Sequence, residues 1–275
     1  MTGSNPVPPT TFEIMISEYL LARDEYEMVR KKYKQVPSTL TLKKDNQSIY
    51  YFGANHSRDP ENEQYGLLRT YWKEFLEETK GEDRAVLIEG GLRVQQSSET
   101  EAIKRGSEGA LISLIATKER VEVQSHDIEL ITLISECPEK KREIADLYWF
   151  LANLDNYLHI TTSPKESFES WFTRWHDYSQ QNMSGGFEPC LSDLKKSYKK
   201  FLGKEFSPNR IPNDLLNPNN TNTPVNKIAQ EISDIREVKV INGIEELWKK
   251  GKSLFIVFGH GHLIIQEPAL RKLVS

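Results

Sequence analysis

The chain contains only two cysteines, Cys137 and Cys190, and they lie far apart in the sequence. Zinc ribbons, redox dithiols and disulfide frameworks need cysteines at short, regular spacings, so the sequence indicates none of these. A single disulfide between the two cysteines stays open at this stage. Long hydrophobic runs are also missing: the mean hydropathy is −0.58, and no stretch has the length and apolar character of a membrane span.

An excess of positive charge is absent as well. The 275 residues include 36 Lys and Arg against 40 Asp and Glu, which gives a formal net charge of −4. Nucleic-acid binding usually requires a basic surface to contact phosphates, so we expect no nucleic-acid partner. Residues 1–6 lack the basic region and apolar stretch of a secretory signal. We therefore expect a cytoplasmic protein that has no membrane association.

Three short apolar runs, by contrast, end in glycine and a side chain that can bind a metal ion or transfer a proton. They cover residues 48–56, 85–91 and 253–262. Continuous runs of β-branched and aromatic residues are typical of strands that are buried on both faces. In an open α/β sheet, ligands bind beyond the carboxyl ends of such strands. Since the side chains at these ends are His56, Glu89 and His262, we expect the three to meet in one crevice.

The remaining pattern predicts a single α/β domain over residues 1–275, with a central, mostly parallel sheet flanked by helices. The expected elements up to residue 124 are a helix over 11–33, a hairpin over 39–53, a helix from about 60 to 76, a strand at 85–89, a helix over 99–117 and a short strand at 121–124. The strand–helix–strand order favours parallel pairing through right-handed crossovers.

The second half of the chain is expected to be largely helical. Helical patterning over about 130–201 is too long for a loop, so we predict a helical insertion over the carboxyl edge of the sheet, about 130–224. Its last part, 206–224, is rich in asparagine and proline, which indicates irregular, mobile backbone. The expected elements after it are a helix at 225–233, a strand at 238–241, a helix at 244–250 and a strand at 254–258.

His56 and His262 each complete a Gly-x-x-His motif, whose register selects His262 over the neighbouring His260. Glycine allows a sharp turn after the strand, and a neutral imidazole is a metal ligand or a general base near pH 7. Two histidines and a glutamate form a common ligand set of hydrolytic zinc, with one position left for water. One such motif alone is more often an ordinary loop histidine, but two copies with Glu89 favour a shared site.

The chain resembles a known group at these positions. Gly53-Ala54-Asn55-His56, Ile88-Glu89 and Gly259-His260-Gly261-His262-Leu263 are similar to the signature of the Tiki/TraB/GumN superfamily, which is related to the erythromycin esterase and ChaN-like proteins. The resemblance spans about 56–262 and implies that His56, Glu89 and His262 are site residues. Members of the group include metal-dependent proteases, metal-independent esterases that use a histidine base, and haem-binding proteins. The resemblance therefore restricts the choice of site residues more than the choice of reaction.

Arg93, Glu108 and Glu129 are further candidates for the same site, and Asp127 is an alternative to Glu129. Arg93 is either the basic partner that some relatives carry after the glutamate or an ordinary surface arginine. Glu108 fits the first turn of a helix, where it is favourable for the helix dipole, and the resemblance implies that it faces the pocket. Asp127 or Glu129 orients a histidine, or Asp127 caps the following helix, which is the favoured interpretation for Asp127.

The predicted function is hydrolysis of an ester or amide bond in a small molecule or a peptide. In the favoured form, His56, Glu89 and His262 bind a divalent metal ion that acidifies water. In a metal-free form, one histidine deprotonates water while Glu89 supports it. The alternatives are a haem- or iron-binding protein that uses the histidines as axial ligands, and an inactive scaffold whose crevice residues bond only to one another.

Overall fold

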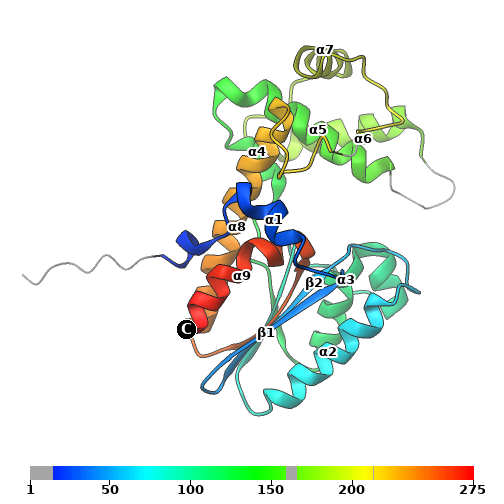
Figure 1. The fold of residues 1–275 in the computed structure, drawn as a ribbon. Coiled ribbons are helices and arrows are strands. Elements are labelled where there is room, and N and C mark those ends of the chain that lie inside the picture. The colour runs from blue at the N-terminus through cyan, green and yellow to red at the C-terminus, as the bar shows by residue number, and fades with distance from the viewer. Residues whose placement is uncertain (1–14, 159–165, 213) are drawn as a thin grey trace, which may run out of the picture.

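The computed structural model describes residues 15–158, 166–212 and 214–275 (Figure 1). Within these residues, five strands form one sheet in the order β1-β2-β5-β3-β4. The strands are β1 (Ser38–Lys44), β2 (Gln47–Ala54), β3 (Arg84–Ile88), β4 (Glu122–Gln124) and β5 (Ser253–Gly259). β1 and β2 form the expected antiparallel hairpin, and every other pairing is parallel. The predicted α/β class with a mostly parallel sheet is confirmed.

The sheet lies between two layers of helices (Figure 1). One layer contains α8 (Pro224–Lys249) and α9 (His260–Val274), and the other contains α2 (Gln64–Glu78) and α3 (Glu99–Lys118). Successive side chains of a strand point to opposite faces. Accordingly, Ile256 and Phe258 of β5 pack in the α8–α9 layer, and Phe255 and Val257 pack in the α2–α3 layer. Because helices cover both faces of the sheet, its strands are continuous apolar runs in the sequence.

A helical region lies beyond the sheet, at the end that carries the carboxyl ends of the parallel strands (Figure 1). It contains α4 (Leu130–Ser135), the 3-10 turn η3 (Glu139–Lys141), α5 (Arg142–Leu158), α6 (Phe168–Asn182) and α7 (Leu191–Leu202). These helices and the start of α8 share a hydrophobic core of their own around Phe150, Trp171 and Val225. The predicted helical insertion is confirmed. No helix in the described part of the chain has both the length and the apolar character needed to cross a membrane.

The segment that was predicted to be irregular contains turns and bends, and no helix or strand, over the described residues 203–212 and 214–223. One side chain from α8 holds its second part. The Nδ2 atom of Asn226 donates hydrogen bonds to the carbonyl oxygens of Asp214, Leu215 and Asn217 at 2.7, 2.9 and 3.1 Å. The backbone here is irregular, as predicted, and it is attached to the first turn of α8.

The strand predicted at 238–241 is wrong, because these residues form the middle of α8. Val240, Ile244 and Leu247 recur at helical spacing and pack on the sheet. The β-branched residues of this stretch suggested a strand, but their burial against the sheet outweighs that preference. The helices predicted on either side are the two ends of the same α8.

The helix predicted over 11–33 is also wrong in its described part, while residues 1–14 lie outside the described residues. The chain forms the 3-10 turns η1 (Ile16–Tyr19) and η2 (Arg23–Glu25) and the short helix α1 (Tyr26–Arg30). Leu20 and Ala22 between them have extended ψ angles of 142°. The backbone N–H of Leu21 instead donates to the carbonyl of Ile265 in α9 at 2.9 Å. This tertiary contact outweighs the local helix propensity.

Candidate functional site

The carboxyl ends of three neighbouring parallel strands bring the predicted site residues together. His56 follows β2, Glu89 follows β3, and His262 lies in the first turn of α9, directly after β5. The Nε2 atom of His56 lies 3.5 Å from Oε2 of Glu89, and the Nε2 atom of His262 lies 3.3 Å from Oε1 of the same carboxylate. Glu89 therefore lies between the two imidazoles. His260, which the motif register excluded, instead contacts Ser38 through Nδ1 at 2.6 Å.

His56 is the more exposed of the two histidines, with 56% of its side chain accessible. Its Nδ1 atom is hydrogen-bonded to Oε1 of Glu108, a buried carboxylate. The hydrogen bond to Glu108 is the main cause that raises the pKa of His56 above its ordinary value of 6.5. Burial acts against this shift, and the negative charge of Glu89 adds to it. The two residues form an imidazole–carboxylate pair, a contact that the sequence did not predict.

A kink in α3 directs Glu108 towards His56. Gly106 and Ser107 leave the helical conformation, and Ser107 adopts a φ of 53°. Positive φ is unfavourable for residues other than glycine and is common at functional sites. The second part of α3 starts directly after this kink, with Glu108 in its first turn, as the sequence indicated.

His262 is largely buried, and both of its ring nitrogens face carboxylates. Nδ1 lies 2.6 Å from Oε1 of Glu237, and Nε2 faces Glu89. Burial lowers the pKa of His262, but the negative charges of Glu237 and Glu89 outweigh burial and raise the pKa to about 10. At neutral pH this imidazole is therefore a cation that holds two carboxylates in place.

The carboxylate of Glu89 is held by donors from several elements. The backbone N–H of Gly259 donates to Oε2 at 2.8 Å, and Nη2 of Arg236 lies 3.5 Å from Oε1. Burial by itself raises the pKa of Glu89, but the charge and hydrogen bond of His262, with the charges of His56 and Arg236, lower it well below 4.5. Glu89 is consequently ionised at neutral pH.

Arg236 is fixed by Asp127. Its Nε and Nη2 atoms lie 2.8 and 2.5 Å from the two carboxylate oxygens of Asp127, which also accepts the backbone N–H of Gly90 at 3.0 Å. Asp127 does not cap α4, contrary to the favoured interpretation. Glu129 occupies the N-cap position of α4, without a side-chain hydrogen bond there. No hydrogen bond or ion pair joins its exposed side chain to His56, Glu89 or His262, so the structure does not bring Glu129 into the site.

Arg236 and Glu237 are the residues that the sequence did not reveal. Glu237 is buried, and Gln266 donates to its Oε2 at 2.7 Å while the hydroxyl of Tyr51 donates to Gln266 at 3.0 Å. Both residues stood next to the strand wrongly predicted at 238–241. In a helix, Glu237 shares a face with Ile241, four residues later. A helical interpretation of this stretch would have indicated its burial.

A cavity of about 720 Å³ lies beside His56 and Glu89. Its lining comes from the loops after β2 and β3, from the kink of α3 and from Asp155 and Asn156 of α5. Arg93 lines it as well, and its Nη2 atom donates to the backbone carbonyl of Glu89 at 3.1 Å. Four of the six predicted site residues line this cavity, namely His56, Glu89, Arg93 and Glu108.

The donor atoms of the predicted metal centre are already engaged in other contacts. Among the described residues, no group of three or more His, Cys, Asp or Glu side chains is placed to hold a metal ion. The physical reason is that His262 has a carboxylate at each ring nitrogen, and Glu89 already accepts from Gly259 and faces Arg236. A bound cation would have to replace these contacts, and an axial bond from His262 to haem would do the same. The divalent metal ion and haem both stay predictions.

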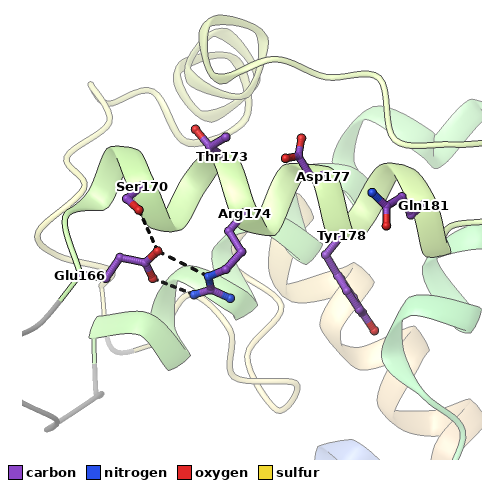
Figure 2. Close-up of a pocket in the computed structure, with 7 residues that line it drawn as sticks. All are labelled: Glu166, Ser170, Thr173, Arg174, Asp177, Tyr178 and Gln181. Atoms are coloured by element: carbon purple, nitrogen blue, oxygen red, sulfur yellow. Dashed lines mark hydrogen bonds and ion pairs between the residues drawn. The ribbon is translucent and has the colours of Figure 1, made fainter.

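A second hollow lies on the outer side of α6 (Figure 2), with a volume of about 580 Å³. Figure 2 shows Glu166 in contact with Ser170 and Arg174 of α6, which donate hydrogen bonds to its carboxylate. The two distances are 2.9 and 2.8 Å. Glu166 and Arg174 thus satisfy each other, and the lining holds no histidine or cysteine. Of these two hollows, the cavity beside His56 is the one whose lining includes a histidine.

No family model, curated protein or solved structure matches this chain. The resemblance to the Tiki/TraB/GumN superfamily stays a prediction, so the function has to be argued from the geometry of the site.

Proposed function

We propose that this chain hydrolyses an ester or amide bond in a small molecule or a peptide, with His56 as the general base. The observation that supports the proposal is the pairing of His56 with the buried Glu108 at the wall of a cavity. An ionised carboxylate only accepts hydrogen bonds, so Nδ1 of His56 carries the hydrogen. The neutral ring then keeps the lone pair of Nε2 for a proton from water.

Glu89 supplies the second contact for the attacking water. Its Oε2 atom lies 3.5 Å from Nε2 of His56. A water molecule that donates one hydrogen to Nε2 and the other to Oε2 directs its lone pair at a carbonyl carbon in the cavity. As the oxygen attacks, its proton passes to Nε2, and the imidazolium that forms is stabilised by the negative charges of Glu108 and Glu89. The attack produces a tetrahedral intermediate. When it collapses, the bond to the leaving oxygen or nitrogen breaks, and the imidazolium returns the proton to that atom.

His262 and Arg236 act on the reaction through Glu89. Both are cations that face its carboxylate, at 3.3 and 3.5 Å. They keep Glu89 ionised and hold it in one orientation, which is what an acceptor for the water requires. This role differs from the ligand role that the sequence suggested for His262, and it is the reason we favour the metal-free form over the metal form.

The proposal is tested by measuring hydrolysis of chromogenic esters and peptide anilides. The proteins compared are wild type, His56→Ala and the control variant His176→Ala. His176 lies on α6 outside the cavity. We expect His56→Ala to lower kcat/KM by about 10²- to 10⁴-fold, and His176→Ala to leave it unchanged. Wild type treated with a chelator should stay active.

Two results would contradict the proposal. Loss of activity on chelation that a divalent cation restores would favour the metal form. Equal rates for wild type and His56→Ala on every substrate would leave the inactive scaffold as the better interpretation.

A further inference from the structure

We infer that the substrate carries an anionic group, a carboxylate or a phosphate, which Arg58, Arg93 and Arg105 bind in the cavity beside His56. The inference rests on the proposed function, because it names the substrate class of that same site. The three arginines come from the loop after β2, the loop after β3 and the first part of α3, and all of them line the cavity.

The charges of these arginines are poorly compensated. Arg93 donates to a backbone carbonyl rather than to a carboxylate. Arg105 approaches Glu101 at only 3.4 Å, with 70% of its side chain exposed, and such a surface pair contributes little. Arg58 forms no ion pair with any of the residues that the structure describes. Uncompensated guanidinium groups in one cavity attract an anion.

Each carboxylate that lines the cavity has at least one partner, although Oε2 of Glu108 is buried without one. Glu89 is held by His262 and Gly259, and Glu108 by His56. The carboxylate of Asp59 accepts the backbone N–H of Glu61 at 3.0 Å. Asp155 is not a free carboxylate either. Of the three arginines, Arg58 and Arg93 have no carboxylate partner among the described residues, so their guanidinium groups can bind an anion.

Glycine backbone provides the channel in which the Arg93 side chain lies. A Cβ atom at Gly90 would be 2.9 Å from Nη2 of Arg93, and Cβ atoms at Gly106 and Gly109 would be 3.7 and 3.9 Å from its side chain. Gly90 also has a φ of 72°, which other residues rarely adopt. The guanidinium is thus positioned by close backbone contacts at the cavity wall. A positioned planar fork suits bidentate binding of carboxylate or phosphate oxygens.

The size of the cavity fits a small substrate. Its volume of about 720 Å³ lies within the range of roughly 300–1,000 Å³ that is typical of small-molecule sites. His56 and the arginines face the same space, so one molecule can place its anionic group on the arginines and its ester or amide carbonyl near Nε2. The inferred substrate is a small anionic ester or amide.

Binding without turnover tests the inference separately from catalysis. We would titrate the full chain with succinate and with inorganic phosphate by calorimetry, which distinguishes a carboxylate from a phosphate as the preferred group. We expect the dissociation constant of the preferred probe to rise by about tenfold or more in each of the variants Arg58→Gln, Arg93→Gln and Arg105→Gln. Each variant loses a hydrogen bond to a charged group. Arg210→Gln, an exposed arginine of the helical region outside the cavity, should bind as wild type does.

The outcomes of the inference and of the proposed function can be told apart. Suppose that a probe binds and that the cavity variants lower its affinity, while no ester or amide is hydrolysed. This result would support the anion site and contradict the proposed function. No binding of either probe, or binding that the cavity variants leave unchanged, would overturn the inference. Equal kcat/KM for 4-nitrophenyl acetate and mono-4-nitrophenyl succinate would also count against it while leaving the proposed function intact.

Discussion

At the scale of single residues, position 259 determines whether His56 can lie beside Glu89. A Cβ atom there would be 2.6 Å from Nε2 of His56 and 3.4 Å from Oε2 of Glu89. The backbone of Gly259, with a φ of −57° and a ψ of 148°, suits any residue. The need for glycine is therefore one of space next to the imidazole rather than of backbone conformation.

Gly259→Ala should displace the His56 ring and lower kcat/KM by about 100-fold, the cost expected for a misplacement of about 1 Å at a catalytic group. Steady-state kinetics with the best ester of the panel provides the measurement. Because the backbone tolerates alanine, the thermal midpoint should change by only a few degrees. Unchanged kinetics would mean that the ring position seen here does not matter for the reaction.

Sequence motifs predicted the residues at strand ends better than those on helices. The two Gly-x-x-His motifs and Glu89 lie together because parallel strands share one carboxyl edge. Asp127 and Glu129 follow a strand as well, yet only Asp127 turns inward, to Arg236. Which of two acidic residues faces a site depends on the partner that packs against it, and that partner lies 109 positions away in the sequence.

At the scale of elements, α8 connects the two halves of the structure. Its 26 residues give it a length of about 39 Å, enough to join the core of the helical region to the sheet. Gly243 lies inside this helix, where a Cβ atom would be 2.3 Å from Cγ of His126. This glycine makes room for the ring of His126.

Gly243→Ala should destabilise the protein by about 1–3 kcal/mol, because overpacking against His126 outweighs the better helix propensity of alanine. Urea unfolding followed by circular dichroism measures the change. Gly66→Ala in α2 is the matched control: it has open space at its Cβ position and should stabilise by up to about 1 kcal/mol. A Gly243→Ala variant that is as stable as wild type would contradict the packing seen here.

The elements that the sequence predicted correctly are those whose local pattern agrees with their burial, such as the hairpin and β5. The kink of α3 was not predicted, because residues 99–117 read as one helix. The middle of α8 and the segment around η1 were mistaken because contacts from distant elements outweigh their local preferences. The helical spacing in the middle of α8 was present but was outweighed by its β-branched residues, whereas the contact of Leu21 with Ile265 leaves no periodic signal.

At the scale of the whole molecule, the site is complete only when both ends of the chain are in place. β5 is the last strand in the sequence but the central one in the sheet, between β2 and β3. His56, Glu89 and His262 thus meet through pairings between segments about 170–200 positions apart. The common edge could be predicted from the sequence, whereas the strand order and the contribution of α8 required the structure.

The pH dependence of ester hydrolysis by wild type and Glu108→Gln tests most directly whether His56 is the base. The base must be neutral, and the pKa of His56 is raised above 6.5 by Glu108. Wild-type kcat/KM should therefore rise with pH through a midpoint above 6.5. Removing the carboxylate charge should lower the pKa of His56, so that the midpoint of Glu108→Gln shifts to lower pH and its plateau falls. A midpoint that stays the same in both proteins, or a wild-type rate that falls as the pH rises through this range, would contradict the assignment of His56 as the base.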